Sequence, residues 1–175
     1  MRATLIFVCC LIVWAAFVWP TSTNDQARMH KFIKFIEANS ELVYNNEPLP
    51  TLHRGSHKEL CSELFEEAPL KCDIAGYYND DTNQIWIANT PTEHMVEEGF
   101  VDVVLVHELV HFLQHNNGVY EIVKCRRELE KKAYKIQDLF VTENGLPDRQ
   151  RPDPLFSLIA SSCQDNFGGP IRGEH

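Results

Sequence analysis

The sequence is short of basic residues. It has 16 Lys and Arg against 25 Asp and Glu, which gives a formal net charge of -9 at pH 7. Nucleic-acid binding depends on clustered Lys and Arg that contact phosphates, so this composition excludes a nucleic-acid partner. The sequence also lacks internal repeats and low-complexity tracts. With 44% hydrophobic residues in 175, it is typical of one globular domain that can fold without a metal, so a metal site would be functional rather than structural.

The N-terminus is apolar and uncharged over residues 3–19, after a single basic residue and before a polar segment. This pattern is typical of a secretory signal, although the run is also just long enough for a membrane anchor. We predict a signal peptide or anchor over 1–23, a single domain over 24–167 and a flexible tail over 168–175. The protein is expected to be secreted or extracytoplasmic, and to meet a membrane only if the N-terminal segment is retained.

The cysteines lack the C-x-x-C spacing of structural zinc sites. Two of the six lie in the apolar N-terminal run, so four belong to the predicted domain: Cys61, Cys72, Cys125 and Cys163. An even number in an exported chain predicts two disulfides, with three pairings open. We favour Cys61–Cys72, which closes a short local loop, and this leaves Cys125–Cys163.

Hydrophobic periodicity predicts a mainly helical α+β domain with a short antiparallel sheet or hairpin. The first helix has an apolar face made of Met29, Phe32, Ile33 and Ile36. The predicted helices cover 25–44, 57–69, a short piece ending at 98, 100–115, 121–141 and 154–163. The predicted strands are 74–78 and 84–88. The second is expected to be an edge strand, which could bind a peptide or serve only in ordinary sheet pairing.

One polar motif, His107-Glu108-Leu109-Val110-His111, interrupts the most apolar predicted helix. On a helix, residues i and i+4 share a face, so His107 and His111 can bind one cation, and Glu108 can reach a water on it. Burying these three side chains without a partner would cost several kcal/mol. The motif therefore predicts a zinc site.

A catalytic zinc has three protein ligands, so a third must be found. His115 lies on the same helix, too far along for both it and His107 to reach one ion. The metzincin pattern requires glycine and histidine where this chain has Gln114 and Asn117. The third ligand is therefore expected on the following helix.

That helix offers Glu121, Glu128 and Glu130. Glu121 falls at the helix start, where an acidic residue favours the helix dipole in any case. Glu128 shares a face with a stripe of lysines, which is typical of a solvated surface. Glu130 lies beside the apolar face of this helix, which includes Ala133. We therefore predict Glu130 as the ligand and keep Glu128 as its competitor.

The motif followed by Glu130-Lys131-Lys132-Ala133 resembles the gluzincin branch of the zincin metallopeptidases. The resemblance covers residues 74–141 and is closest to small, minimal zincin domains. It implies a zincin-like fold, Zn²⁺ held by His107, His111 and Glu130, Glu108 as the general base, and a peptide or protein substrate that pairs with the edge strand. The chain departs from larger gluzincins because it lacks a second substrate-binding domain.

Further roles follow from this resemblance. An oxyanion needs a second donor, and Tyr120, Tyr134 and His115 are the candidates. We expect an exported zinc-dependent hydrolase, peptidase-like in its chemistry. The alternative is a secreted, disulfide-stabilised binding or inhibitory module that keeps the zincin scaffold without turnover; a structural zinc is less favoured, because such sites are usually closed by four Cys or His ligands. The oligomeric state is not predicted.

Overall fold

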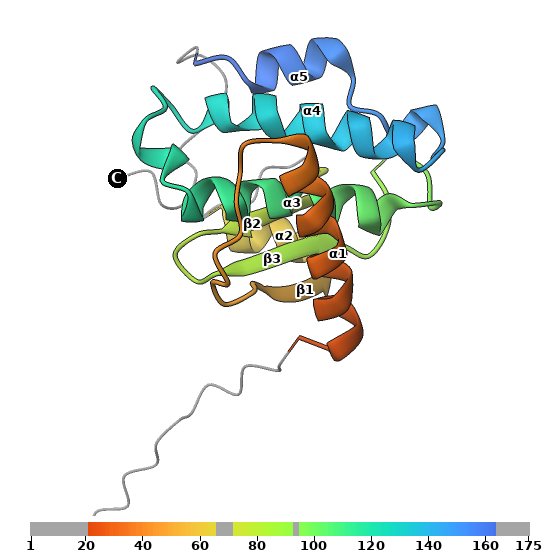
Figure 1. Ribbon diagram of the computed structural model, residues 1–175. Coiled ribbons are helices and arrows are strands. Elements are labelled where there is room, and N and C mark those ends of the chain that lie inside the picture. The colour runs from red at the N-terminus through yellow and green to blue at the C-terminus, as the bar shows by residue number, and fades with distance from the viewer. Residues whose placement is uncertain (1–20, 66–71, 93–94, 164–175) are drawn as a thin grey trace, which may run out of the picture.

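A computed structural model describes residues 21–163, apart from 66–71 and 93–94 (Figure 1). The predicted α+β class is confirmed. The predicted N-terminal signal or anchor lies almost wholly outside the described residues. The predicted tail lies wholly outside them. The elements are α1 (Thr23–Asn39), β1 (Thr51–Gly55), α2 (His57–Leu64), β2 (Gly76–Asn79), β3 (Gln84–Ala88), α3 (Phe100–Asn116), the 3-10 turn η1 (Val119–Glu121), α4 (Arg127–Glu143), the 3-10 turn η2 (Asp148–Gln150) and α5 (Pro154–Ala160).

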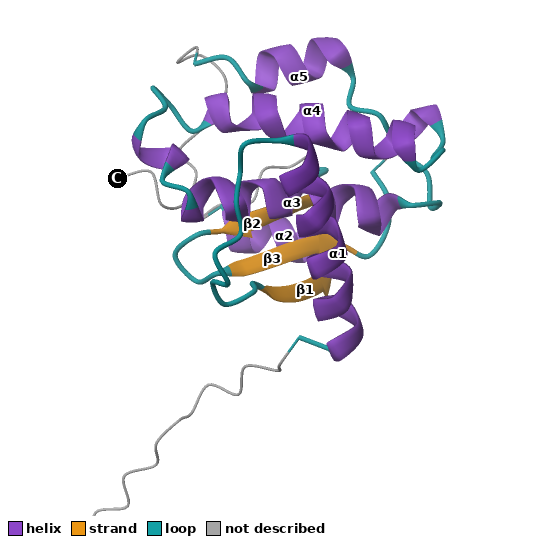
Figure 2. Ribbon diagram, viewed as in Figure 1, coloured by secondary structure: helices purple, strands orange, loops and turns teal. Residues whose placement is uncertain are grey.

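Helix α3 forms the centre of the domain. It contacts β2, β3, α1 and α4, and nearly all of its side chains are buried (Figure 2). A helix that is apolar all round must be covered all round, which is the environment that its sequence predicts. Gly99 precedes it with a φ of 75°, and a Cβ there would lie 2.9 Å from Leu146. The centre of the fold therefore holds the motif helix.

The sheet is mixed, with the strand order β1-β3-β2. The predicted hairpin is confirmed, because β2 and β3 pair antiparallel. The sequence did not indicate β1, which pairs parallel with β3 through a register of Thr51 with Gln84. The prediction that residues 84–88 form an edge strand is therefore wrong: β3 is central. A parallel partner arrives through a long connection, and nothing local in a five-residue strand indicates where it will pair.

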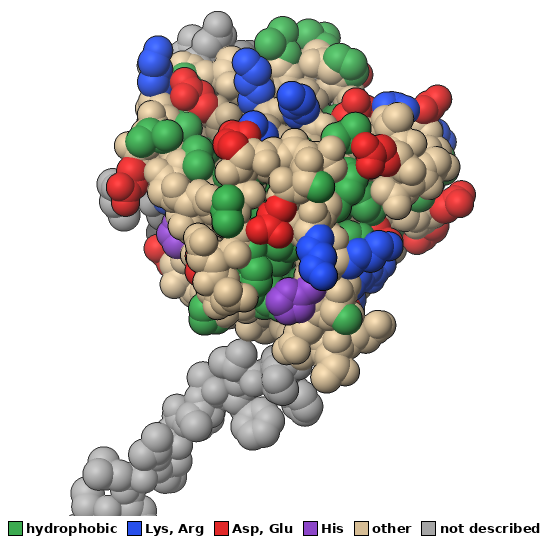
Figure 3. All heavy atoms as spheres, in the orientation of Figure 1, with side chains coloured by type: hydrophobic (Ala, Val, Ile, Leu, Met, Phe, Trp, Pro, Cys, Tyr) green, Lys and Arg blue, Asp and Glu red, His purple; other side chains and the backbone are tan. Residues whose placement is uncertain are grey.

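Helices α1 and α4 both pack on α3, and the start of α1 also lies beside the sheet, where Asp25 pairs with Arg54 of β1 at 2.8 Å (Figure 1). The predicted apolar face of α1 is confirmed, since Met29, Phe32, Ile33 and Ile36 are all buried. Phe140 of α4 meets the rings of Phe32 and Phe35 edge to face, with centroids 5.2 and 5.3 Å apart. On the face shown in Figure 3, acidic and basic side chains are interspersed over the outer surface. The amphipathic helices thus enclose α3 and leave a charged exterior.

Several predicted boundaries are wrong. Helix α4 begins at Arg127 rather than at 121, because η1 and an irregular segment occupy the first part of that range. Helix α1 ends at Asn39 and α5 at Ala160, both short of their predicted ends, and α2 is described to Leu64. Described residues 95–99 form bends and a turn instead of the predicted short helical piece. Among the described residues, no helix combines the length and apolar character that crossing a membrane requires.

Two disulfides, Cys61–Cys72 and Cys125–Cys163, confirm the favoured pairing. Cys61 is buried on α2, so the first bridge ties Cys72 to the core. The second bridge joins the segment before α4 to the segment after α5. It therefore holds the C-terminal helix against the start of α4.

Removing the second disulfide should destabilise the protein more than removing the first. A bridge limits the unfolded chain more strongly when its loop is longer, and the loops span 38 and 11 residues. Loop-closure entropy gives about 4 kcal/mol for the Cys125→Ser/Cys163→Ser variant and about 3 kcal/mol for Cys61→Ser/Cys72→Ser. Urea unfolding of the metal-free protein measures both losses. An equal free energy of unfolding for the Cys125→Ser/Cys163→Ser variant and the parent would contradict the prediction.

Candidate metal centre

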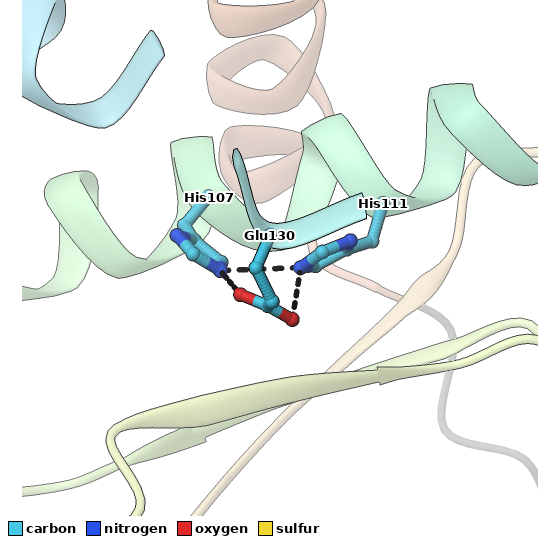
Figure 4. Close-up of side chains that lie close together, drawn as sticks. All are labelled: His107, His111 and Glu130. Atoms are coloured by element: carbon cyan, nitrogen blue, oxygen red, sulfur yellow. Dashed lines mark hydrogen bonds and ion pairs between the residues drawn. The ribbon is translucent and has the colours of Figure 1, made fainter. Parts of the chain in front are cut away.

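Three side chains from two helices converge beside the sheet (Figure 4). Helix α3 contributes His107 and His111, which are one turn apart, and α4 contributes Glu130. The two Nε2 atoms are 3.1 Å apart. The carboxylate oxygens of Glu130 lie 3.1 Å from Nε2 of His107 and 3.2 Å from Nε2 of His111. These three residues could hold one metal ion.

The spacing of the donor atoms fits a tetrahedral ion. With bonds of about 2.0–2.1 Å, neighbouring ligand atoms around zinc lie about 3.3 Å apart, and the observed spacings are close to this value. Both histidine side chains are about nine-tenths buried, and that of Glu130 is 28% exposed. Two imidazole nitrogens and a carboxylate brought together in this way repel one another unless protons or a cation lie between them. The donor set therefore fits the expected zinc.

The structure separates Glu130 from its two competitors. Glu128 turns away from the histidines and accepts a hydrogen bond from the backbone N–H of Lys124 at 3.2 Å. Glu121 is exposed in η1. The apolar periodicity of α4 explains the difference, because Ala133 is fully buried against the core and Glu130 lies next to that face. The choice of Glu130 from the sequence thus agrees with its position in the fold.

Glu108 lies beside the two histidines and points toward β2. Its side chain is buried and accepts a hydrogen bond from the backbone N–H of Tyr78. Burial raises the pKa of Glu108 above its ordinary value, although the neighbouring His107 and His111 oppose this shift. A carboxyl group with a raised pKa holds a proton more readily than an ordinary glutamate does.

Strand β2 passes very close to α3 at this point. A Cβ on Gly76 would lie 2.6 Å from Cγ1 of Val104 and 2.8 Å from the carbonyl oxygen of Trp86. It would also lie 3.3 Å from the carboxylate of Glu108. Glycine is therefore required here, because any side chain would push the strand away from the motif helix.

The charges of the group are strongly coupled. Burial would raise the pKa of Glu130, but the charge of His111 and hydrogen bonds from both imidazoles hold it well below its ordinary value. Burial would lower the pKa of His111, but the negative charge of Glu130 outweighs this effect and raises the pKa to about 9. The negative charge of Glu130 and the positive charge that it favours on His111 thus stabilise each other.

The three candidate oxyanion donors fall in two places. Tyr134 lies one turn beyond Glu130 on α4, and its ring meets that of His107 edge to face at 4.8 Å. Burial, together with the charges of Glu130 and Glu108, raises the pKa of Tyr134, so its hydroxyl keeps its proton. Tyr120 and His115 instead pack on each other, with ring centroids 5.4 Å apart. Tyr134 is therefore the candidate that contacts a residue of the metal group.

Sequence reasoning did not identify two glutamines as part of the site. Nδ1 of His107 lies 2.8 Å from Oε1 of Gln137, and Nδ1 of His111 lies 2.9 Å from Oε1 of Gln114. Both glutamine side chains are buried. Their sequence positions carried a signal, because Gln114 interrupts an apolar helix one turn after His111 and Gln137 lies two turns after Glu130.

Comparison with known proteins gives a family and no function. A family model described as "Domain of unknown function (DUF6647)" matches residues 21–165. No curated protein and no solved structure matches the chain significantly. The matched region contains every described helix and strand and all residues of the metal group. The chain belongs to this family, the domain of unknown function DUF6647.

Proposed function

We propose that this protein is a zinc-dependent hydrolase that cleaves amide bonds, most simply peptide bonds. The observation that carries the proposal is the convergence of His107, His111 and Glu130 next to the buried carboxyl of Glu108. Two imidazoles and one carboxylate are a ligand set of catalytic zinc sites, which keep a position for water or substrate. Structural zinc sites usually have four Cys or His ligands instead.

Each residue of the site has a role in this chemistry. Nε2 of His107, Nε2 of His111 and the carboxylate of Glu130 would hold the ion. When bound, zinc would supply a Lewis acid that polarises the substrate carbonyl and lowers the pKa of water. Glu108 takes the proton of the attacking water and returns it to the amine that leaves, for which its raised pKa is suited.

Tyr134 is suited to stabilise the oxygen of the carbonyl that is attacked. Its hydroxyl keeps its proton, and its ring packs on His107. A donor that is already in place when charge develops on the substrate lowers the barrier without reorganisation. Tyr134 is therefore proposed as the second oxyanion donor.

Strand β2, rather than β3, is proposed to bind the substrate backbone. The backbone N–H of Ala88 donates to the carbonyl of Ala75 at 2.8 Å, so the alternating ladder turns the N–H and C=O groups of Gly76 and Tyr78 away from β3. Tyr78 directs its N–H to Glu108, which places this edge of the sheet beside the metal group. An extended peptide paired with the remaining outward groups, the N–H and C=O of Gly76 and the C=O of Tyr78, would therefore bring its carbonyl to the site.

The two disulfides support export. Such bridges form in oxidising compartments and are rare in reducing ones. We propose that the protein acts outside the cytoplasm, with a peptide or protein as its substrate.

The metal content of the purified protein tests the proposal. Protein prepared without chelators or added metal should contain about one zinc per chain by mass spectrometry. It should cleave members of a mixed peptide library, lose this activity on treatment with a chelator, and regain it when zinc is added back. Absence of stoichiometric zinc would refute the proposal. Bound zinc without cleavage would favour the non-catalytic binding module instead.

A further inference from the structure

Two buried glutamines hold the outer nitrogens of the metal-binding imidazoles. The amide of Gln114 has one orientation only, because its Nε2 donates to the carbonyl of Leu129 at 2.9 Å. Its Oε1 must then face Nδ1 of His111 at 2.9 Å, and an amide oxygen can only accept. Nδ1 of His111 therefore carries the proton. With one nitrogen fixed as donor, the lone pair of the neutral ring is at Nε2, directed at the metal group.

Gln137 makes the equivalent arrangement at the other imidazole. Its Nε2 faces the carbonyl of Gln150 at 3.4 Å, and its Oε1 lies 2.8 Å from Nδ1 of His107. Gln150 is itself fully buried and donates to the carbonyls of Val96 and Glu98. The orientation of Gln137 is thus fixed by a buried chain of hydrogen bonds that leads to the segment before α3.

The two glutamines also connect the helices that supply the metal ligands. Gln114 lies on α3 and bonds to Leu129, the residue immediately before Glu130 on α4. Gln137 lies on α4 and bonds to His107 on α3. One glutamine therefore reaches from α3 to α4 beside His111, and the other reaches from α4 to α3 beside His107. Together they fix both the orientation of the rings and the distance from the rings to Glu130.

Resting on the proposed function, we propose that Gln114 and Gln137 are positioning residues of the metal site: each accepts the Nδ1 proton of one imidazole and holds its Nε2 toward Glu130. Loss of a partner of this kind typically weakens metal binding by about 10- to 100-fold. The partners here are neutral amides. A carboxylate would be a stronger acceptor and would make the imidazole a stronger ligand, so a bound ion would be more electrophilic beside these amides than beside carboxylates.

Nuclear magnetic resonance of the metal-free protein with ¹⁵N-labelled histidine tests the positioning directly. Both Nδ1–H protons should be visible and protected from exchange in the parent protein. Gln137→Met keeps the length of the side chain but removes the amide acceptor, so it should abolish the protected proton of His107 and leave that of His111. Gln114→Met should do the reverse, and each variant is thus the matched control for the other.

Zinc affinity, measured by competition with a chromophoric chelator, gives the second readout. Each Met variant should bind zinc about 10- to 100-fold more weakly than the parent. Gln137→Glu retains an acceptor for Nδ1 of His107, so it should keep the protected proton and bind zinc at least as tightly as the parent. A merely structural glutamine would not be rescued in this way, because the Glu variant loses the donor to the Gln150 carbonyl.

The outcomes separate this inference from the proposed function. Absence of the protected Nδ1–H protons in the parent protein, or their survival in both Met variants, would overturn the inference even if the protein binds zinc and cleaves peptides. Selective loss in the two Met variants would support it even if no peptide is cleaved. If a Met variant fails to fold, Gln137→Glu provides the test: retention of the protected Nδ1–H proton of His107 in that variant would support the inference, and its loss would overturn it.

Discussion

Glu108→Gln should reduce peptide hydrolysis by about 10²- to 10⁴-fold while zinc stays bound. The change removes the group that takes and returns the proton, but keeps the size of the side chain. Glu108 is not part of the three-residue metal group, so the ligands are untouched. Turnover of a peptide identified in the library screen, together with zinc content, measures both effects.

The stability of the Glu108→Gln variant gives an independent check on the same residue. Burial raises the pKa of the carboxyl, which means that its charged form is disfavoured in the folded protein. A neutral amide removes that penalty, so the free energy of unfolding of the metal-free protein should not fall. Glu128→Gln, on the lysine side of α4, is the control and should leave activity within about twofold. Full activity of Glu108→Gln would eliminate it as the general base.

Glu130→Gln should weaken zinc binding by more than about 100-fold, beyond the range expected when a residue that only contacts a ligand is lost. The amide is neutral and cannot supply the charge with which Glu130 faces both imidazoles, at 3.1 and 3.2 Å. Hydrolysis should fall with the zinc occupancy. Zinc affinity by competition and zinc content after dialysis provide the measurements.

Glu128→Gln is the matched control for this prediction. The two residues are on the same helix and differ in that Glu130 belongs to the metal group, whereas Glu128 accepts from the backbone of Lys124. The control should keep the zinc affinity of the parent. If Glu128→Gln lost zinc and Glu130→Gln kept it, the ligand assignment would be reversed.

Much of the site was predictable because helical periodicity is local. The spacing of His107 and His111 places them on one face wherever the helix lies in the fold. The apolar residues around them predict that the helix is buried, and all of the motif is indeed buried. The same periodicity on the following helix distinguished Glu130 from Glu128. Each of these conclusions depends on residues within one or two turns of one another.

Other features depend on contacts between distant segments. Strand β1 pairs with β3 although α2 and β2 lie between them in the sequence, and this pairing makes β3 central and β2 an edge strand. The substrate edge predicted for residues 84–88 was wrong for that reason. A strand of five residues has a local pattern that is consistent with several neighbours, so long-range packing decides the order.

The sequence by itself therefore determined which types of side chain form the candidate metal group, which helices carry them, and which residues compete to be its third member. Only the tertiary structure decided which strand edge faces the site, that Tyr134 packs on His107, and that Gln114 and Gln137 hold the imidazoles. The physical reason is that a helix fixes the direction of a side chain relative to its own axis. The distance between two helices, and hence the partner that each buried polar group meets, is set by packing over the whole domain.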